Sequence, residues 1–137
     1  MMRPRDTNGR CVSTSSSSER ATGLQHVVLF AFADDLGLAD AAEMRRQITT
    51  WPELIGGFRT LRFGADATGV RTRGHQYLLY MEFDSAVELL AYQQHPVHQV
   101  FLGWVIEHNC TPLAFDYELS SDTVIWPPPA PVRLGES

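Results

Sequence analysis

The stretch LQHVVLFAFA (residues 24–33) decides how this chain is expected to fold. It is rich in β-branched and aromatic residues, which is typical of a β-strand. Successive side chains of a strand point to opposite faces, and both faces are apolar here: Leu24, Val28, Phe30 and Phe32 on one, Val27, Leu29, Ala31 and Ala33 on the other. A strand with one face in water would alternate apolar and polar residues. Both faces of this strand are therefore expected to be buried.

The flanking sequence predicts six further elements. They are a helix over residues 38–51 that ends before Gly56, strands over 58–63 and 75–83 separated by the loop 65–74, helices over 85–94 and 96–109, and a strand over 112–119. Asp40 with Glu43, and Ser85 with Glu88, have the spacing of a capping box at a helix start. Pro96 is expected in the first turn of the third helix.

The order β-α-β-β-α-α-β indicates an α+β fold, the ferredoxin-like plan with an antiparallel sheet and a second helix broken in two. The helical segments can cover only one face of a four-stranded sheet. The second apolar face is then expected to meet another copy of the chain, which predicts a homodimer. Two sheets closing face to face would form a dimeric α+β barrel that offers a cavity for a small molecule.

The composition separates one domain from two tails. Residues 1–22 are polar, with four consecutive serines and no apolar periodicity, and are predicted to be disordered. Residues 120–137 hold four prolines and are predicted to be an extended tail, with recognition by an aromatic groove as a minor alternative. The folded unit is expected over residues 23–119.

Charge and hydropathy limit the partners that we expect. All eleven basic residues are arginine, and sixteen acidic residues give a net charge of −5, which argues against nucleic-acid binding. No apolar run approaches the roughly 20 residues of a membrane span, and no secretory signal is evident, so a cytoplasmic protein is predicted. Cys11 and Cys110 are expected to be unpaired thiols.

The densest group of chemically capable residues lies in AYQQHPVHQVF (residues 91–101). Tyr92 could donate a hydrogen bond to a carbonyl or an enolate, and His98 could accept a proton near neutral pH. Asp116, preferred over Glu118, is the candidate that would orient the His98 imidazole. The plain structural alternative is that His95 caps the third helix, Tyr92 packs against it, and His98 with Asp116 ties helix to sheet.

Other candidates are weaker. His95 and His98 could hold a metal together with His108 or Glu107, but no carboxylate occurs at matching helical spacing, so no metal site is predicted. His26 could line a pocket face of the sheet with Tyr77, or could be a hydrogen-bonded core histidine. Phosphate-loop, dinucleotide, nucleophile-elbow and zincin motifs are missing, so no cofactor is expected.

Several of these segments together resemble the stress-response A/B barrel (Dabb) domain family. They are HVVLFAF at the start, Phe63-Gly64, MEFDS, the HPxH element in AYQQHPVHQVF, and the closing FDYEL, which together span residues 24–119. The resemblance implies a dimeric ferredoxin-like α+β barrel. Many members of this family are stress-associated proteins without a defined activity, which implies a binding or structural role.

One branch of this family, olivetolic acid cyclase, is a cofactor-free polyketide cyclase. Resemblance to it implies that Tyr92 and His98 are catalytic, that Asp116 holds His98, and that His26 lies in the pocket. Tyr77 stands where the cyclase has a further pocket histidine, and His75 replaces a neighbouring tyrosine, so the ligand is expected to differ. The resemblance implies an aromatic or polyketide-like ligand. A cofactor-free monooxygenase is a further alternative.

Overall fold

A computed structural model of the chain describes residues 22–129. Residues Leu24–Tyr117 form one compact unit, and the described residues 22–23 and 118–129 belong to a second. The elements in chain order are β1 (Leu24–Phe32), α2 (Leu38–Thr49), α3 (Trp51–Leu54), β2 (Thr60–Ala65), β3 (Tyr77–Phe83), α4 (Ala86–Gln94), α5 (Pro96–Glu107) and β4 (Cys110–Glu118). The predicted order of strands and helices is thus confirmed, with one additional short helix, α3. Most of the two predicted tails, residues 1–21 and 130–137, lies outside the described residues.

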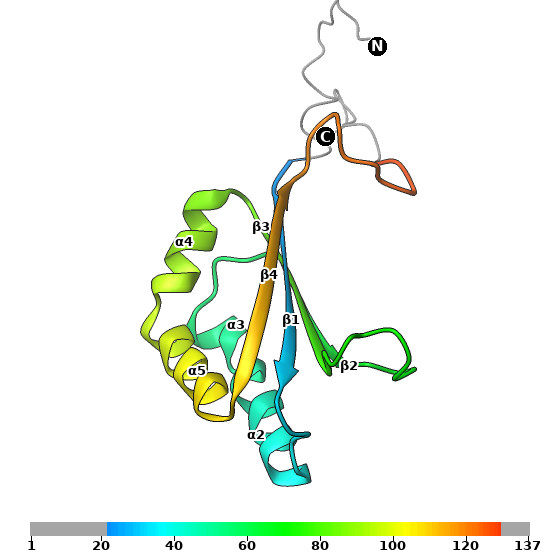
Figure 1. The fold of residues 1–137 in the computed structure, drawn as a ribbon. Helices are drawn as coiled ribbons and strands as arrows, with labels where there is room; N and C mark the ends of the chain where they lie inside the picture. Colours follow the sequence, from blue (N-terminus) through cyan, green and yellow to red (C-terminus); the bar gives the residue numbers. More distant parts are fainter. Residues whose placement is uncertain (1–21, 130–137) are drawn as a thin grey trace, which may run out of the picture. The chain divides into compact units, whose positions relative to one another are not determined.

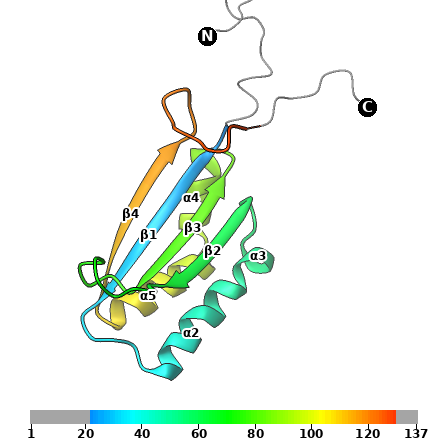
Figure 2. The same cartoon turned by 90° about the vertical axis from the view of Figure 1, so that its right-hand side faces the viewer.

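The four strands form one sheet in the order β2-β3-β1-β4 (Figure 2). β3 pairs antiparallel with both β1 and β2. β4 also runs antiparallel to β1, because Ala33 at the end of β1 bonds to Asn109 before β4, whereas His26 near the start of β1 bonds to Asp116 near the end of β4. This is the ferredoxin-like α+β fold that the sequence predicts.

All four helices lie against one face of the sheet, which we call the covered face (Figure 1). In β1 every second side chain is buried and the intervening ones are half-buried, so the strand alternates as its sequence predicts. We call the other side the open face. By alternation and register its side chains are those of Gln25, Val27, Leu29, Ala31, Thr60, Arg62, Leu78, Tyr80, Glu82, Leu113, Phe115 and Tyr117.

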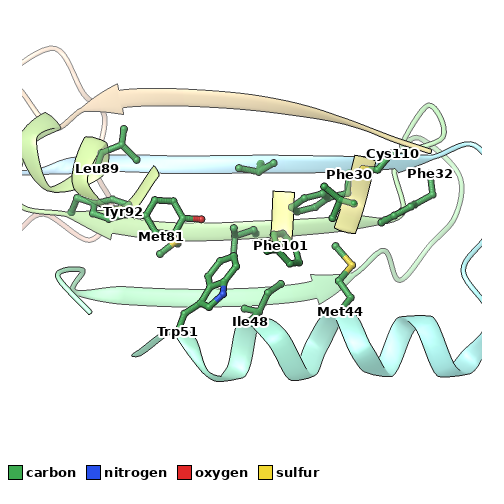
Figure 3. Packing of buried hydrophobic residues seen from close by; sticks show 14 of the residues in the cluster. Phe30, Phe32, Met44, Ile48, Trp51, Met81, Leu89, Tyr92, Phe101 and Cys110 are labelled. Atoms are coloured by element: carbon green, nitrogen blue, oxygen red, sulfur yellow. The ribbon is translucent and has the colours of Figure 1, made fainter. Parts of the chain in front are cut away.

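The hydrophobic core fills the layer between the covered face and the helices (Figure 3). β1 and β3 supply Phe30, Leu79 and Met81, and the helices supply Trp51 and Phe101, all of them at most 3% exposed. Trp51 meets Phe101 edge-on at a ring separation of 5.0 Å. Aromatic residues from three elements therefore hold the helical layer to the sheet.

The predicted helix starts have different outcomes. At α4 the prediction is confirmed, since the Ser85 hydroxyl oxygen accepts a bond from the Val87 N–H at 3.2 Å. At α2 the capping-box prediction is wrong, because the helix begins at Leu38, after Gly37, and has no side-chain cap. The Glu43 carboxylate instead bonds to Arg46 and Gln47 along the helix, an alternative that the spacing does not reveal.

Two boundaries also differ from the predicted ones. The predicted helix 38–51 divides at Thr50, and Pro52 lies in the first turn of the short helix α3, where a missing N–H is tolerated. β2 is shifted toward the C-terminus and continues through Gly64 to Ala65, since β3 provides ladder partners for both residues. Pairing with a neighbouring strand outweighs the weak strand propensity of glycine.

Residues 22–23 and 118–129 contain local backbone hydrogen bonds. The Leu119 N–H donates to the Gly23 carbonyl at 2.9 Å, and residues 120–123 form a turn in which the Thr123 N–H donates to the Ser120 carbonyl. Residues 119–129 hold no helix or strand. No helix in the part of the chain between residues 22 and 129 is long and apolar enough to cross a membrane.

Candidate functional site

Four polar side chains meet the aromatic layer at one end of the covered face. His26 comes from β1, Asp116 from β4, Tyr92 from α4, and His98 from the first turn of α5. We call this group the histidine–tyrosine cluster. β1 and β4 are neighbouring strands, which brings His26 and Asp116 together, and the break between α4 and α5 at Pro96 allows Tyr92 and His98 to face each other.

His26 and Asp116 form a hydrogen-bonded pair across β1 and β4. Nδ1 of His26 lies 2.5 Å from Oδ1 of Asp116. His26 is 3% exposed and is the only polar residue buried among those described, whereas the Asp116 side chain is 36% exposed. A carboxylate only accepts, so Nδ1 of His26 carries the proton. The pair connects the buried layer to the surface.

The sequence assigned Asp116 to His98, and the hydrogen bond of the structure runs to His26 instead. Nδ1 of His98 lies 3.1 Å from the carbonyl oxygen of Gln93, in the last turn of α4. The physical reason is position, since Asp116 and His26 occupy adjacent positions on paired strands, and His98 finds a backbone acceptor five residues away. Sequence spacing contains no sign of either contact.

His98 is held in a form that can accept a proton. Desolvation by burial lowers its pKa, with a smaller contribution from the nearby His26, so the neutral ring is favoured near pH 7. A backbone carbonyl only accepts, so Nδ1 carries the proton of the neutral ring and Nε2 keeps its lone pair. The ring centroid lies 4.5 Å from that of Tyr92.

Two buried residues beside His98 carry hydrogen-bond donors, and one of these donors, on Trp51, is itself buried without a partner. Tyr92 is 2% exposed, and burial raises its pKa. No hydrogen bond from the described residues reaches its hydroxyl. Trp51 is fully buried, and its Nε1–H has no hydrogen-bond partner within the described residues. The centre of the Trp51 ring lies 5.6 Å from that of Tyr92 and 6.0 Å from that of His98. Trp51 is therefore a direct neighbour of the four residues of the cluster.

Sequence reasoning assigned Trp51 only a packing position on the first helix. A tryptophan at the end of an amphipathic helix usually belongs to the core, and its position in the sequence cannot show whether the indole N–H finds an acceptor. Figure 3 shows the Trp51 and Tyr92 rings in the layer between helices and sheet. Buried N–H groups are nearly always hydrogen-bonded, so the unpaired Nε1–H of Trp51 needs an explanation.

The remaining predicted residues lie elsewhere. His95 caps α5, with its Nδ1 accepting from the Val97 N–H at 3.1 Å, as the structural alternative predicts. Tyr77 shares the covered face with His26, but the register pairs Tyr77 with Phe30 and His26 with Met81. Four residues along a strand separate their levels by about 13 Å. Tyr77 stacks on Phe63 instead, at a ring separation of 5.6 Å.

The alternative metal site is not assembled in the part of the chain that the structure describes. No group of three His, Cys, Asp or Glu side chains there could hold a metal ion. His108 lies at the far end of α5 from His98, where it stacks on Trp104 and pairs with Asp40 at 3.6 Å. What the cluster offers chemically is one nitrogen acceptor, on His98, and two buried donors, on Tyr92 and Trp51.

A family model for the stress responsive A/B barrel domain (Dabb) matches residues 24–119. This range covers all elements of the fold. The match agrees with the motifs at residues 26–32, 95–98 and 115–119 on which the resemblance rests. No curated protein matches the chain.

Solved structures with the same fold have various descriptions. A dimeric ferredoxin-like protein of unknown function from Thermobifida fusca is 22% identical, with a TM-score of 0.62 over 73% of this chain and 93% of that one. A hypothetical Arabidopsis thaliana protein is also 22% identical, with a TM-score of 0.65 over 80% and 100%. Hydroxynitrile lyase from Passiflora edulis is 12% identical, with a TM-score of 0.65 over 74% and 97%. At these identities the likeness shows the fold alone.

Proposed function

The chain belongs to the stress responsive A/B barrel (Dabb) family, and we propose that it works as a homodimer in which each protomer binds a small organic molecule at the histidine–tyrosine cluster. The observation that supports binding is the buried Trp51 Nε1–H, which has no partner within the described residues and lies beside the Tyr92 ring. A bound acceptor would satisfy this donor. A buried donor left unpaired costs about 1–3 kcal/mol, so such a ligand would also stabilise the protein.

The chemistry of the cluster favours a neutral molecule that has a carbonyl group and an acidic proton. The carbonyl oxygen would accept from Tyr92 or Trp51, and the acidic proton would face Nε2 of His98. Desolvation keeps His98 neutral, so the cluster supplies no cation for an anionic ligand. The neighbouring aromatic rings of Trp51, Phe83 and Phe101 suit an aromatic or polyketide-like body.

Self-association is supported by the open face and by relatives. Leu78, Leu113 and Phe115 are 40%, 54% and 66% exposed there, and a face of this kind is usually covered in the working protein. The solved relatives from Thermobifida fusca and Bacteroides fragilis are described as dimeric ferredoxin-like proteins. Sedimentation velocity on the full chain would test the dimer, and a monomer at micromolar concentration would contradict it. A cytoplasmic location stays a prediction from the sequence.

Ligand binding can be tested with benzoylacetone, an aromatic β-diketone. Isothermal titration calorimetry should detect binding to the wild type and a loss of about fivefold in affinity for Tyr92→Phe, because one hydrogen bond is worth about 1 kcal/mol. Tyr77→Phe is the matched control, since it removes the same hydroxyl at the other end of the sheet. Equal losses in the two variants would contradict binding at the cluster.

A second candidate is a cofactor-free proton-transfer enzyme of the polyketide cyclase type. The observation that favours it is the neutral His98, whose Nε2 keeps a lone pair beside Tyr92. Nε2 would take a proton from the carbon between two carbonyls, the C–H electron pair would form the enolate, and the Tyr92 hydroxyl would donate to the enolate oxygen. Asp116 would act through His26 rather than on the base.

The two candidates differ in a measurable way. An enzyme of this kind should accelerate deuterium exchange at C2 of ethyl 3-oxohexanoate in heavy water, followed by NMR. His98→Ala should then lower that acceleration by about a hundredfold. His95→Ala is the matched control, because the His95 side chain caps α5 and only its backbone N–H, which alanine keeps, bonds to Tyr92. If the wild-type protein binds benzoylacetone but does not accelerate deuterium exchange, the result would favour a ligand-binding protein over an enzyme.

A further inference from the structure

On the open face, apolar side chains of neighbouring strands lie next to one another and form an apolar row across the sheet. Polar side chains form a second row, the polar row, parallel to it. In the ladder of β1 and β3, Leu29 lies opposite Leu78. On the other side of β1, the register set by His26 and Asp116 places Leu113 of β4 opposite Leu29. Toward the start of β1, on the same face, Gln25 lies opposite Glu82. The apolar row can pack against another surface, but the polar row requires a partner of matching chemistry.

Glu82 is the one acidic side chain of the open face. Its Oε2 accepts from Nε2 of Gln25 at 3.0 Å and from the Tyr80 hydroxyl. Within residues 22–129 no hydrogen bond reaches the other carboxylate oxygen, Oε1. The carboxylate is thus fixed in direction by two neighbours and keeps one oxygen free for a further donor.

Arg62 is the one basic side chain of the same face. It is exposed, and its guanidinium carbon lies 5.7 Å from the centre of the Tyr80 ring. No ion pair joins Arg62 to a carboxylate in the part of the chain that the structure describes. Tyr80 therefore contacts both charged groups, Arg62 through its ring and Glu82 through its hydroxyl. Neither charged group forms an ion pair with an oppositely charged side chain within residues 22–129.

We propose that Glu82 of one protomer pairs with Arg62 of the partner subunit when two open faces meet, an inference that rests on the proposed homodimer. The open face is complementary in charge to a second copy of itself, since it carries both Glu82 and Arg62. A two-fold dimer brings the same patch of both copies together, so one Glu82 and one Arg62 per protomer form two identical contacts. A carboxylate that is buried in the dimer interface without such a partner would oppose association.

The pair would select the partner and the relative orientation of the sheets. The apolar row is nonspecific, because any flat apolar surface could cover it. Two reciprocal ion pairs are satisfied only when the faces meet in one arrangement, and they penalise other partners by leaving charges unpaired. Dimer specificity would thus depend on the polar end of the face and dimer strength on the apolar row.

Two charge-reversed variants of the full chain test the proposal, Glu82→Arg and Arg62→Glu. Each alone places like charges at both contacts and should raise the dimer dissociation constant by about a hundredfold. Mixed together they should form a heterodimer. One of its contacts joins the introduced arginine of one chain to the introduced glutamate of the other, and the second contact joins the native Arg62 to the native Glu82. Native mass spectrometry separates this heterodimer from either homodimer by mass.

The outcomes are distinct. If Glu82 and Arg62 paired within one protomer, both single variants would be repulsive, and mixing them would not restore dimer formation. The doubly reversed chain would still restore it. This combination of results would overturn the proposal. Wild type that is monomeric would overturn the proposed homodimer itself. Recovery both on mixing and in the double variant supports the proposal, provided that circular dichroism shows each variant to be folded.

Discussion

The covered face and the open face alternate along the same strands, but only the covered face has its side chains packed by the protomer itself. Leu79 and Leu78 are neighbours in β3, and they are 1% and 40% exposed. The covered face has one buried polar residue among those described, His26, whereas the open face carries a polar row that includes Gln25 and Glu82. Alternation along a strand thus assigns a residue to a face, whereas the contribution of that residue to stability depends on what covers the face.

The largest effect is expected when the two leucines are exchanged for alanine. Leu79→Ala should lower the free energy of unfolding by about 3 kcal/mol, because it leaves a cavity in a packed layer. Leu78→Ala should cost the protomer less than about 1 kcal/mol and should weaken the dimer instead. Urea unfolding and sedimentation velocity at one protein concentration measure the two effects. Equal unfolding costs would remove the distinction between the faces.

The next effect concerns the buried polar residue of the covered face. Asp116→Ala should lower the free energy of unfolding by about 2 kcal/mol, because it leaves the buried Nδ1–H of His26 without an acceptor. Asp116→Asn should recover part of this loss, since the amide oxygen still accepts. Glu118→Ala, an exposed carboxylate of the same strand, is the control in urea unfolding. A loss as large for Glu118→Ala would show that strand charge, not the His26 bond, matters.

A smaller effect should come from the helical layer that makes the covered face different. Ser85→Ala removes the acceptor of the Val87 N–H and should cost about 1 kcal/mol. Ser85→Asp, which keeps a capping oxygen, should be close to wild type in thermal unfolding. If both substitutions destabilise alike, the cap is not the source of the effect.

The smallest effect is a pH dependence from His98. Its pKa in the folded protein lies below the ordinary value of 6.5, with desolvation as the main cause. As pH falls through 6.5 toward the folded pKa, the unfolded chain binds a proton that the folded one does not, so the free energy of unfolding decreases. His98→Asn should show a flatter decrease over this window in urea titrations. An unchanged slope would mean that His98 stays solvated.

The apolar pattern made most of the fold predictable. Residues 24–33 have a strand-like composition with two apolar faces, and Ser85 with Glu88 marks a helix start that the structure confirms. The errors occurred where local patterns are ambiguous. Asp40 and Glu43 have capping spacing, but Glu43 bonds along the helix, because helix and cap compete for the same side chain.

The candidate site was predictable in residue types but not in connections. Tyr92, His98, His26 and Asp116 all lie in the cluster, whereas Tyr77 lies at the other end of the sheet. Trp51 was seen only as a core residue. No rule of spacing reports that an indole N–H lacks an acceptor, because that depends on atoms from several elements.

By itself the sequence determined which segments are strands and helices and which side of each strand is apolar, because these properties depend on neighbours along the chain. The tertiary structure decided which polar groups meet. Asp116 binds His26, 90 residues away, because β4 lies beside β1, and Glu82 and Arg62 share Tyr80 because β2 lies beside β3. Hydrogen bonds require atoms within about 3 Å, a condition that only the packed strands fulfil.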